Sequence, residues 1–120
     1  MSKVLIIEDD MAIARALKEK FELEGFSVIQ AEDGNKGVDL AKHQRPDLLL
    51  LDLILPGLDG LAVLENLMSN SETKSIPVIV LTNVSNEKVE AETKRLGAKM
   101  FLVKTDWKLD EVIEKAKSVL

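Results

Sequence analysis

The sequence predicts a doubly wound α/β fold, in which one parallel five-stranded sheet is covered by helices on both faces. Five short apolar runs recur along the 120 residues, and amphipathic segments with helical spacing lie between them. Most runs are continuous rather than alternating, which is typical of strands buried on both faces. Five β-α units in succession imply right-handed crossovers. At this length the economical arrangement is a flavodoxin-like sheet of order 2-1-3-4-5 with five helices.

Each of the five expected strands is four residues long. They cover residues 4–7, 26–29, 48–51, 78–81 and 100–103. The run at 48–51 consists of leucine alone and is the ambiguous one, because leucine favours helix. Its short length and the preceding Pro46 favour a strand.

The helical segments repeat their apolar residues three or four positions apart. The spacing runs through Ile13, Leu17 and Phe21, through Leu61, Leu64, Leu67 and Met68, and through Leu109, Val112, Ile113 and Ala116. Asp33 and Asp59 are placed to act as helix N-caps. Gly25 and Gly97 follow helical segments at positions where a left-handed cap is expected.

The fourth helix, over residues 86–96, is predicted to be the least firmly held element. Its apolar anchors are only Val89, Ala91 and Leu96, and charged residues fill most of the other positions. A helix that buries little apolar area gains little stability from packing.

Composition excludes several classes of protein. Hydrophobic residues make up 46% and charged residues 31%, an ordinary globular balance, and the length fits one domain over residues 1–120. The absence of cysteine excludes disulfides and thiol redox chemistry. No apolar run has the length of a membrane span or a signal-peptide core, so cytoplasmic residence is expected. The net charge of −5 disfavours direct binding to nucleic acid or anionic membranes.

Chemically reactive side chains follow four of the five expected strands. They are Glu8, Asp9 and Asp10 after the first, Asp52 after the third, Thr82 after the fourth and Lys104 after the fifth. In an open parallel sheet, ligands bind beyond the carboxyl ends of the strands, where the strand order reverses. In the order 2-1-3-4-5 that point lies between strands one and three, so these side chains should meet at one edge.

Neighbouring carboxylates raise one another's pKa or require a cation. Mg²⁺ is suited to such a site, because it takes one or two carboxylates together with waters and phosphate oxygens. A metal, a carboxylate nucleophile, a hydroxyl and an ammonium are the components of phosphoryl transfer. In that chemistry Lys104 would neutralise phosphoryl oxygens, and Thr82 would donate a hydrogen bond to another oxygen.

In this order and spacing, the motifs resemble the receiver domains of two-component response regulators. The matching pieces are residues 4–10, residues 52–60, Thr82 at 30 positions after Asp52, Lys104 at 22 positions after Thr82, and Gly97-Ala98 followed by residues 101–104. The resemblance covers the whole chain. It extends to stand-alone chemotaxis-type regulators and to the N-terminal receiver domains of transcriptional regulators.

The resemblance implies roles for these residues. Asp52 would be the phosphoacceptor, with Thr82 and Lys104 assisting. Mg²⁺ would be bound by Asp9 directly, by Glu8 through water, by Asp52, and by the backbone carbonyl of Ile54. Phe101 would be the switch aromatic that turns inward when Thr82 engages the phosphoryl group. Asp10 lies one position beyond the usual acidic pair and is assigned to the helix N-cap.

The resemblance also implies partners and an output. The phosphoryl donor would be a sensor histidine kinase or a histidine phosphotransfer protein. Phosphorylation would change the surface of helix four, strand five and helix five, and a phosphorylation-dependent homodimer is one outcome. Such a module is a signalling phosphoprotein rather than an enzyme, because it catalyses only its own phosphorylation and dephosphorylation.

The chain departs from the family pattern at two positions. Thr105 stands where the family usually has a proline whose preceding bond is typically cis. Ile54, two residues after Asp52, is large and apolar at a position that the resemblance links to water access. We therefore expect slow self-dephosphorylation.

Other interpretations remain open from the residues alone. Residues 8–10 could simply cap a helix, Lys104 could be a structural ion-pair partner of Asp52, and Phe101 could be a core residue. A phosphatase similar to the haloacid dehalogenase group would need an acid at Ile54 and a covering domain. A receiver that no longer takes phosphate would act as a constitutive interaction module. A nucleotide or flavin binder lacks support, because no glycine-rich loop follows the first strand. His43, the only histidine, is expected at the solvated surface.

Overall fold

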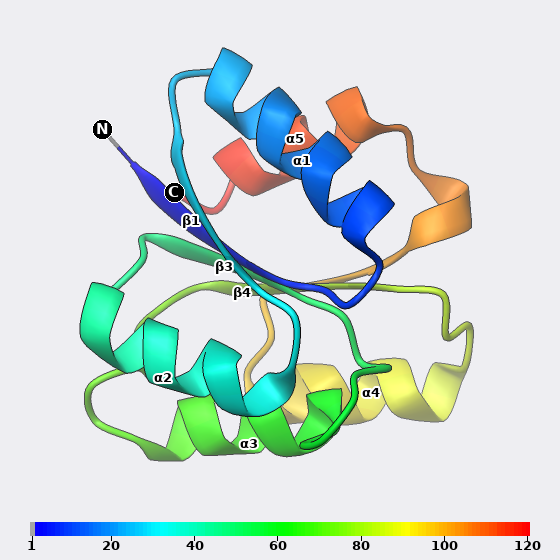
Figure 1. Cartoon of the computed structure of the whole chain (residues 1–120). Coiled ribbons are helices and arrows are strands. Elements are labelled where there is room, and N and C mark those ends of the chain that lie inside the picture. The colour runs from blue at the N-terminus through cyan, green and yellow to red at the C-terminus, as the bar shows by residue number, and fades with distance from the viewer. Residues whose placement is uncertain (1) are drawn as a thin grey trace.

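A computed structural model describes residues 2–120 as a parallel sheet between two layers of helices (Figure 1). The strands are β1 (Lys3–Ile7), β2 (Ser27–Ala31), β3 (Leu48–Leu51), β4 (Val78–Thr82) and β5 (Met100–Val103). They pair in the order β2-β1-β3-β4-β5, and each pair is parallel. The predicted fold class and strand order are confirmed.

Helices connect the strands and cover both faces of the sheet. They are α1 (Met11–Leu23), α2 (Gly34–Gln44), α3 (Gly60–Ser69), α4 (Glu87–Leu96) and α5 (Leu109–Lys117), with a short 3₁₀ turn at Lys104–Asp106. Helices α1 and α5 lie on one face, and α2, α3 and α4 lie on the other (Figure 1). Within residues 2–120, no helix combines the length and apolar character needed to cross a bilayer.

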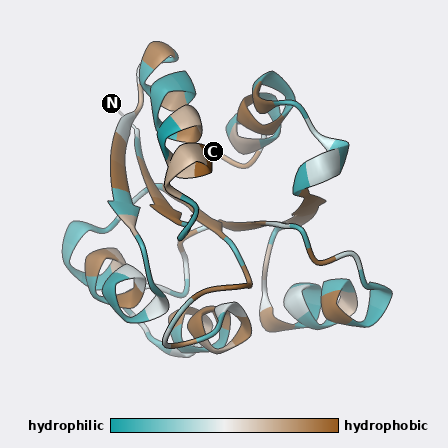
Figure 2. Ribbon diagram, turned by 45° about the vertical axis from the view of Figure 1, so that its right-hand side comes forward, coloured by the Kyte–Doolittle hydropathy of each residue, from teal (hydrophilic) through white to brown (hydrophobic). Residues whose placement is uncertain are grey.

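The continuous apolar runs form strands because both faces of the sheet are covered. In β1, Val4 and Ile6 pack in the core beneath α1 and α5, whereas Leu5 and Ile7 pack in the core on the opposite face. Strands β3 and β4 divide their side chains in the same way. The colouring in Figure 2 shows apolar residues along the central strands and on the inward helix faces. The leucine run is therefore a strand with every residue buried.

Strand β2 differs from its predicted bounds. It begins at Ser27 rather than Phe26 and continues through Gln30 to Ala31. Its register is set by pairing with all five residues of β1. Gln30 is tolerated in this edge strand because its Nε2 donates a hydrogen bond to the Ala14 carbonyl at 2.9 Å. A criterion based on apolar runs stops before a polar residue and could not find this extension.

The predicted helix caps are present. The side chains of Asp10, Asp33 and Asp59 each accept a hydrogen bond from a backbone N–H in the first turn of α1, α2 and α3. Gly25 and Gly97 adopt φ angles of 91° and 117°, in the left-handed region where glycine is favoured. The Asp10 cap sets the start of α1 next to the carboxyl end of β1.

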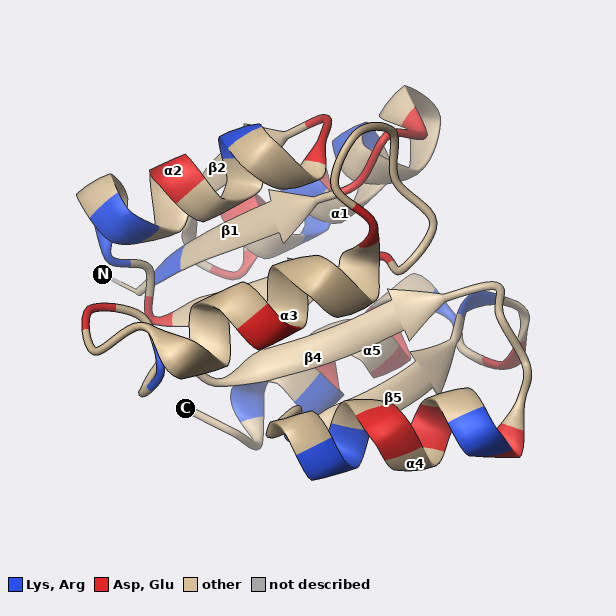
Figure 3. Cartoon of the chain, turned by 90° about the horizontal axis from the view of Figure 1, so that it is seen from below, with Lys and Arg blue, Asp and Glu red and all other residues tan. Residues whose placement is uncertain are grey.

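Helix α4 is anchored differently from the prediction. Val89 and Leu96 are half-buried against the core as expected, but Ala91 is exposed. The only buried residue of α4 is Thr93, whose hydroxyl donates to the Glu90 carbonyl at 2.8 Å. Positions 89, 93 and 96 share one helix face, and position 91 points away from it. Every other α-helix between residues 2 and 120 buries at least three residues, and Figure 3 shows charges of both signs along α4.

Candidate functional site

The carboxyl ends of β1 and β3 bring three carboxylates together. Glu8 and Asp9 follow β1, and Asp52 follows β3. The Asp52 backbone N–H donates to the Ile7 carbonyl at 3.0 Å, which extends the β1–β3 pairing and fixes the position of the acid. Carboxylate oxygens of the three acids lie within 4.8 Å of one another. The predicted convergence at the point of strand reversal is therefore present.

These acids line an open pocket of about 250 Å³. Its walls are formed by Glu8, Asp9, Asp10, Ile13, Asp52, Ile54, Asn83 and Lys104. Five of the predicted site residues thus share one pocket. Glu8 and Asp52 are buried at its base, whereas Asp9 and Ile54 are exposed, Ile54 to 60%. Asn83 was not assigned to this site from the sequence, although its place directly after β4 was a signal for the same edge.

Lys104 holds the two buried acids. Its Nζ lies 2.9 Å from Asp52 Oδ2 and also forms an ion pair with the carboxylate of Glu8. The side chains of Lys104, Glu8 and Asp52 are only 11%, 3% and 7% exposed. The interpretation of Lys104 as an ion-pair partner of Asp52 is confirmed. The pairing with Glu8 was not foreseen, because it requires side chains from β1 and β5 to reach across β3 and β4.

Burial and pairing shift the pKa values of this buried cluster, defined as Lys104, Glu8 and Asp52. Burial raises the pKa of Glu8 from 4.5 to about 7, although the hydrogen bond from Lys104 opposes the rise. Burial alone would also raise the pKa of Asp52, but hydrogen bonds from Lys104 and Glu8 outweigh it and lower that pKa. Burial disfavours the Lys104 ammonium, yet hydrogen bonds to both acids raise its pKa. The pKa values of the two acids are therefore shifted in opposite directions, upward for Glu8 and downward for Asp52.

Two backbone features define the segment that follows Asp52. Asp52 Oδ1 accepts a hydrogen bond from the Ile54 N–H at 3.1 Å, so one carboxylate oxygen faces this turn and the other faces Lys104. Gly60, the first residue of α3, packs directly against the same segment. A Cβ at Gly60 would lie 2.2 Å from the Leu53 Cα and 2.7 Å from the Asp52 carbonyl oxygen. Only glycine permits α3 to begin this close to the acid.

Two predicted residues lie near the pocket without lining it. Thr82 is fully buried, and its hydroxyl accepts a hydrogen bond from the Val84 N–H at 3.3 Å. Phe101 is half-buried and packs against the core beneath α2, α3 and α4. In this conformation neither side chain is among those that form the walls of the acidic pocket.

The other positions singled out from the sequence are also defined. Residues 2–120 contain no cis peptide bond, so the Lys104–Thr105 bond is trans and leads into the 3₁₀ turn. His43 is exposed as expected, and its Nδ1 lies 2.8 Å from the Asp39 carbonyl. Trp107 packs partly against the core over the segment that leads into α5.

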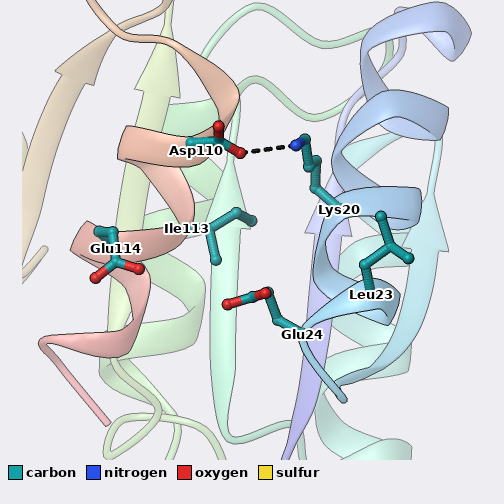
Figure 4. Close-up of a pocket in the computed structure, with 6 residues that line it drawn as sticks. All are labelled: Lys20, Leu23, Glu24, Asp110, Ile113 and Glu114. Carbon is teal, nitrogen blue, oxygen red and sulfur yellow. Dashed lines mark ion pairs between the residues drawn. The ribbon is translucent and has the colours of Figure 1, made fainter.

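A second groove lies away from the acids, between α1 and α5. It has a volume of about 270 Å³ and is lined by Lys20, Leu23, Glu24, Asp110, Ile113 and Glu114 (Figure 4). Lys20 Nζ and Asp110 Oδ1 are paired across it at 2.7 Å, with side chains 40% and 80% exposed. Its charged groups are solvated, unlike those of the buried cluster.

A model of the response regulator receiver domain family matches residues 4–117. The chain is 36% identical over 104 residues to protein PilH of Pseudomonas aeruginosa, a match that covers 87% of this chain and 86% of PilH. It is 35% identical over 118 residues to sporulation initiation phosphotransferase F of Bacillus subtilis, covering 98% and 93% of the two chains. Some relatives are about twice as long. The chain spans 49% of the DNA-binding dual master transcriptional regulator RpaA of Synechocystis, to which it is 36% identical over 120 residues, its full length.

Solved structures agree with these sequence matches. The chemotaxis protein CheY4 of Vibrio cholerae superimposes with a TM-score of 0.92 at 26% sequence identity, covering 100% of this chain and 99% of that protein.

Proposed function

The chain belongs to the response regulator receiver domain family, and we infer that it accepts a phosphoryl group on Asp52 from a sensor histidine kinase or a histidine phosphotransfer protein. Membership implies phosphorylation-dependent signalling and a signalling domain rather than a classical enzyme. We propose residues 1–120 as one such domain. The Bacillus relative is named a phosphotransferase, which is consistent with this assignment.

The observation that carries the proposal is the buried Asp52 carboxylate, which lines an open acidic pocket and is paired with Lys104. An Asp52 oxygen would attack the phosphorus of the donor, forming a P–O bond as the P–N bond to the donor histidine breaks. Lys104 already contacts the Asp52 carboxylate and would pair with a phosphoryl oxygen as negative charge builds up there. Catalysis in such a site is mainly positioning and charge stabilisation.

The residues present fit a magnesium ion. Glu8, Asp9 and Asp52 offer hard oxygen ligands at close range, as Mg²⁺ prefers, and Asp9 is exposed at the rim where an ion would enter. We propose that Asp9 and Asp52 bind the ion directly, Glu8 through water, and Ile54 through its carbonyl oxygen. When bound, the ion neutralises phosphoryl oxygens. A cation there would favour the deprotonated form of Glu8.

The proposed switch uses Thr82 and Phe101. The Thr82 hydroxyl is occupied by the Val84 N–H and would have to turn toward a phosphoryl oxygen. Phe101 would move further inward into the space that Thr82 leaves. The weakly anchored α4 would follow, changing the surface of α4, β5 and α5 that faces an output partner or a second copy of the chain. Phosphorylation would act by shifting the population between two conformations. We propose that this domain does not bind nucleic acid directly.

The proposal is tested by phosphorylating the protein with acetyl phosphate and Mg²⁺ and recording intact mass. The expected result is one phosphoryl adduct that requires the metal and is lost in Asp52→Asn. Asp39→Asn is the matched control, because it neutralises an exposed acid on α2 and should leave the adduct unchanged. An adduct that persists in Asp52→Asn, or a folded protein that forms none, would overturn the assignment.

A further inference from the structure

Trp107 separates two hollows on the α1–α5 side of the molecule. The inner one is a pocket of about 160 Å³, walled by Ile13, Leu17, Leu81, Leu109, Val112 and the side chain of Lys104. The outer one is a more open groove of about 310 Å³, formed by Trp107 together with Asp110, Glu111, Glu114 and Lys115. The ring thus borders a partly open apolar pocket on one side and a charged surface of α5 on the other.

The inner pocket suits an apolar occupant. Apart from Lys104, its walls are hydrocarbon side chains or the indole ring. The ammonium of Lys104 points to Glu8 and Asp52, so its methylene groups face the pocket. Among residues 2–120, no buried side-chain nitrogen or oxygen lacks a hydrogen-bond partner, so no buried polar group there requires a polar ligand.

Trp107 packs only partly against the core in its present position. Its backbone N–H reaches the Lys104 carbonyl at 3.5 Å, near the limit of a hydrogen bond. Its ring is half-buried, and Lys115 Nζ lies 5.2 Å from the ring centre on the surface. The residue sits in extended backbone between the 3₁₀ turn and α5, and the turn itself begins at Lys104. A movement of Lys104 would therefore affect Trp107 both through the short turn that connects them and through the pocket wall that they share.

The volume of the pocket, about 160 Å³, bears on whether it can hold the ring. A cavity of about 150 Å³ holds a single benzene ring. Indole has a second, fused ring and needs more room. The aliphatic part of the Lys104 side chain forms one wall of the pocket. If this side chain moved away, the pocket would enlarge toward the size of the indole.

We propose that Trp107 is a gate whose ring moves into the inner pocket when a phosphoryl group on Asp52 draws Lys104 away from Glu8. This inference rests on the proposed function of Asp52. The phosphoryl oxygens lie farther from the backbone of Asp52 than its own carboxylate oxygens, so the ammonium that follows them extends its stem. The outer groove then loses its aromatic wall, and Lys115 loses its contact with the ring. The start of α5 becomes a surface that reports phosphorylation to a partner.

The sequence makes a direct test available, because Trp107 is the only tryptophan and the chain has no tyrosine. Trp107 fluorescence would be recorded with acetyl phosphate and Mg²⁺, against Mg²⁺ alone, with intact mass measured on the same samples. We expect emission to shift to shorter wavelength and acrylamide quenching to fall roughly twofold, as a half-exposed ring becomes buried. Asp52→Asn should show neither change.

A variant that fills the pocket tests the mechanism. Val112→Leu adds a methylene group to the pocket wall and should reduce the spectral shift while the phosphoryl adduct still forms. Val119→Leu is the matched control, because Val119 packs on the same core outside the pocket and should keep the full shift. A complete adduct with unchanged emission and quenching would overturn the gate and leave the role of Asp52 intact. A shift to longer wavelength would also overturn it, because the ring would have moved outward. Absence of the adduct would overturn both proposals.

Discussion

Two clusters in this protein have the same composition, one lysine and two carboxylates, and differ in their surroundings. They are the buried cluster of Lys104, Glu8 and Asp52, and a surface cluster of Lys117, Glu24 and Glu114 between α1 and α5. Side-chain exposure is 11% or less throughout the buried cluster, but 40%, 41% and 75% in the surface cluster. Figure 4 shows the two acids of the surface cluster on facing helices.

The comparison shows that location, rather than composition, decides how strongly a charged cluster is perturbed. In the buried cluster, removal of water raises the pKa of Glu8 to about 7. Burial would also raise the pKa of Asp52, but hydrogen bonds from Lys104 and Glu8 lower it. In the surface cluster, the hydrogen bond to Glu24 raises the pKa of Lys117. Water screens this exposed ion pair, so breaking it should change the stability of the protein little. The carboxyl ends of β1 and β3 provide the buried position, whereas the surface cluster lies at the C-terminal ends of α1 and α5.

The largest expected effect comes from removing the buried lysine. Lys104→Met would leave two acids facing each other without a cation, so we expect a loss of about 3 kcal/mol in the free energy of unfolding near neutral pH. The loss should shrink in acid, because Glu8 can take up a proton. Urea unfolding followed by circular dichroism measures both values. Lys117→Met is the matched variant, and an equal loss there would remove the distinction between the clusters.

The pH dependence of stability sharpens the comparison. Because the folded pKa of Glu8 is about 7 and its usual value is 4.5, the folded protein binds more protons in this interval. Stability of the metal-free protein should therefore decline by up to about 3 kcal/mol as pH rises through this window. The lowered pKa of Asp52 acts in the opposite direction, and its contribution is lost only as pH falls below the usual 3.8.

Glu8→Gln should flatten this pH profile, because the amide has no proton to lose. The measurement is urea unfolding in EDTA at about pH 5 and about pH 8. Glu24→Gln, in the surface cluster, should retain the slope of the parent protein. A parent whose stability is constant over this interval would contradict the account of Glu8.

Magnesium should stabilise the protein only through the three acids of the pocket, Glu8, Asp9 and Asp52. At a free concentration ten times its dissociation constant, Mg²⁺ should add about 1.4 kcal/mol to the free energy of unfolding. The gain should be smaller in acid, where the proton on Glu8 competes with the ion. Thermal unfolding with and without Mg²⁺ measures it. Asp9→Asn should lose most of the gain and Glu24→Gln none; equal gains in both variants would place the ion elsewhere.

The smallest effect is expected at the surface cluster itself. Lys117→Met should leave the unfolding midpoint in moderate salt within experimental error, because salt screens exposed charges beyond a few ångströms. A midpoint that drops clearly at high salt would show that this pair is more protected from water than its exposure indicates.

The sequence predicts the fold and most of the residues that line the pocket, but it does not predict which side chains contact one another. Runs of buried residues and the caps at Asp10, Asp33 and Asp59 depend on local chemistry, and these predictions are confirmed. The Glu8–Lys104 pair could not be predicted, because it depends on how far two side chains reach between strands that are not neighbours. The roles of the site residues stay predictions.

Helix α4 shows the same limit on a smaller scale. Ala91 was chosen as an anchor because it is apolar, but it lies on the exposed face. Thr93 is polar and lies outside the apolar pattern, yet it is the buried residue of α4, and its hydroxyl donates a hydrogen bond within the helix. The phase of a short charged helix is set by packing against the sheet, which a single sequence shows only weakly.

The most direct test of the central claim is to locate the phosphoryl group on the chain. After reaction with acetyl phosphate and Mg²⁺, borohydride reduction converts a phosphorylated aspartate to homoserine, which peptide mass mapping identifies by position. The account predicts one modified residue, Asp52. Modification of Glu24 or Glu114, or spread over many exposed acids, would contradict the claim that burial beside Lys104 makes this carboxylate the acceptor.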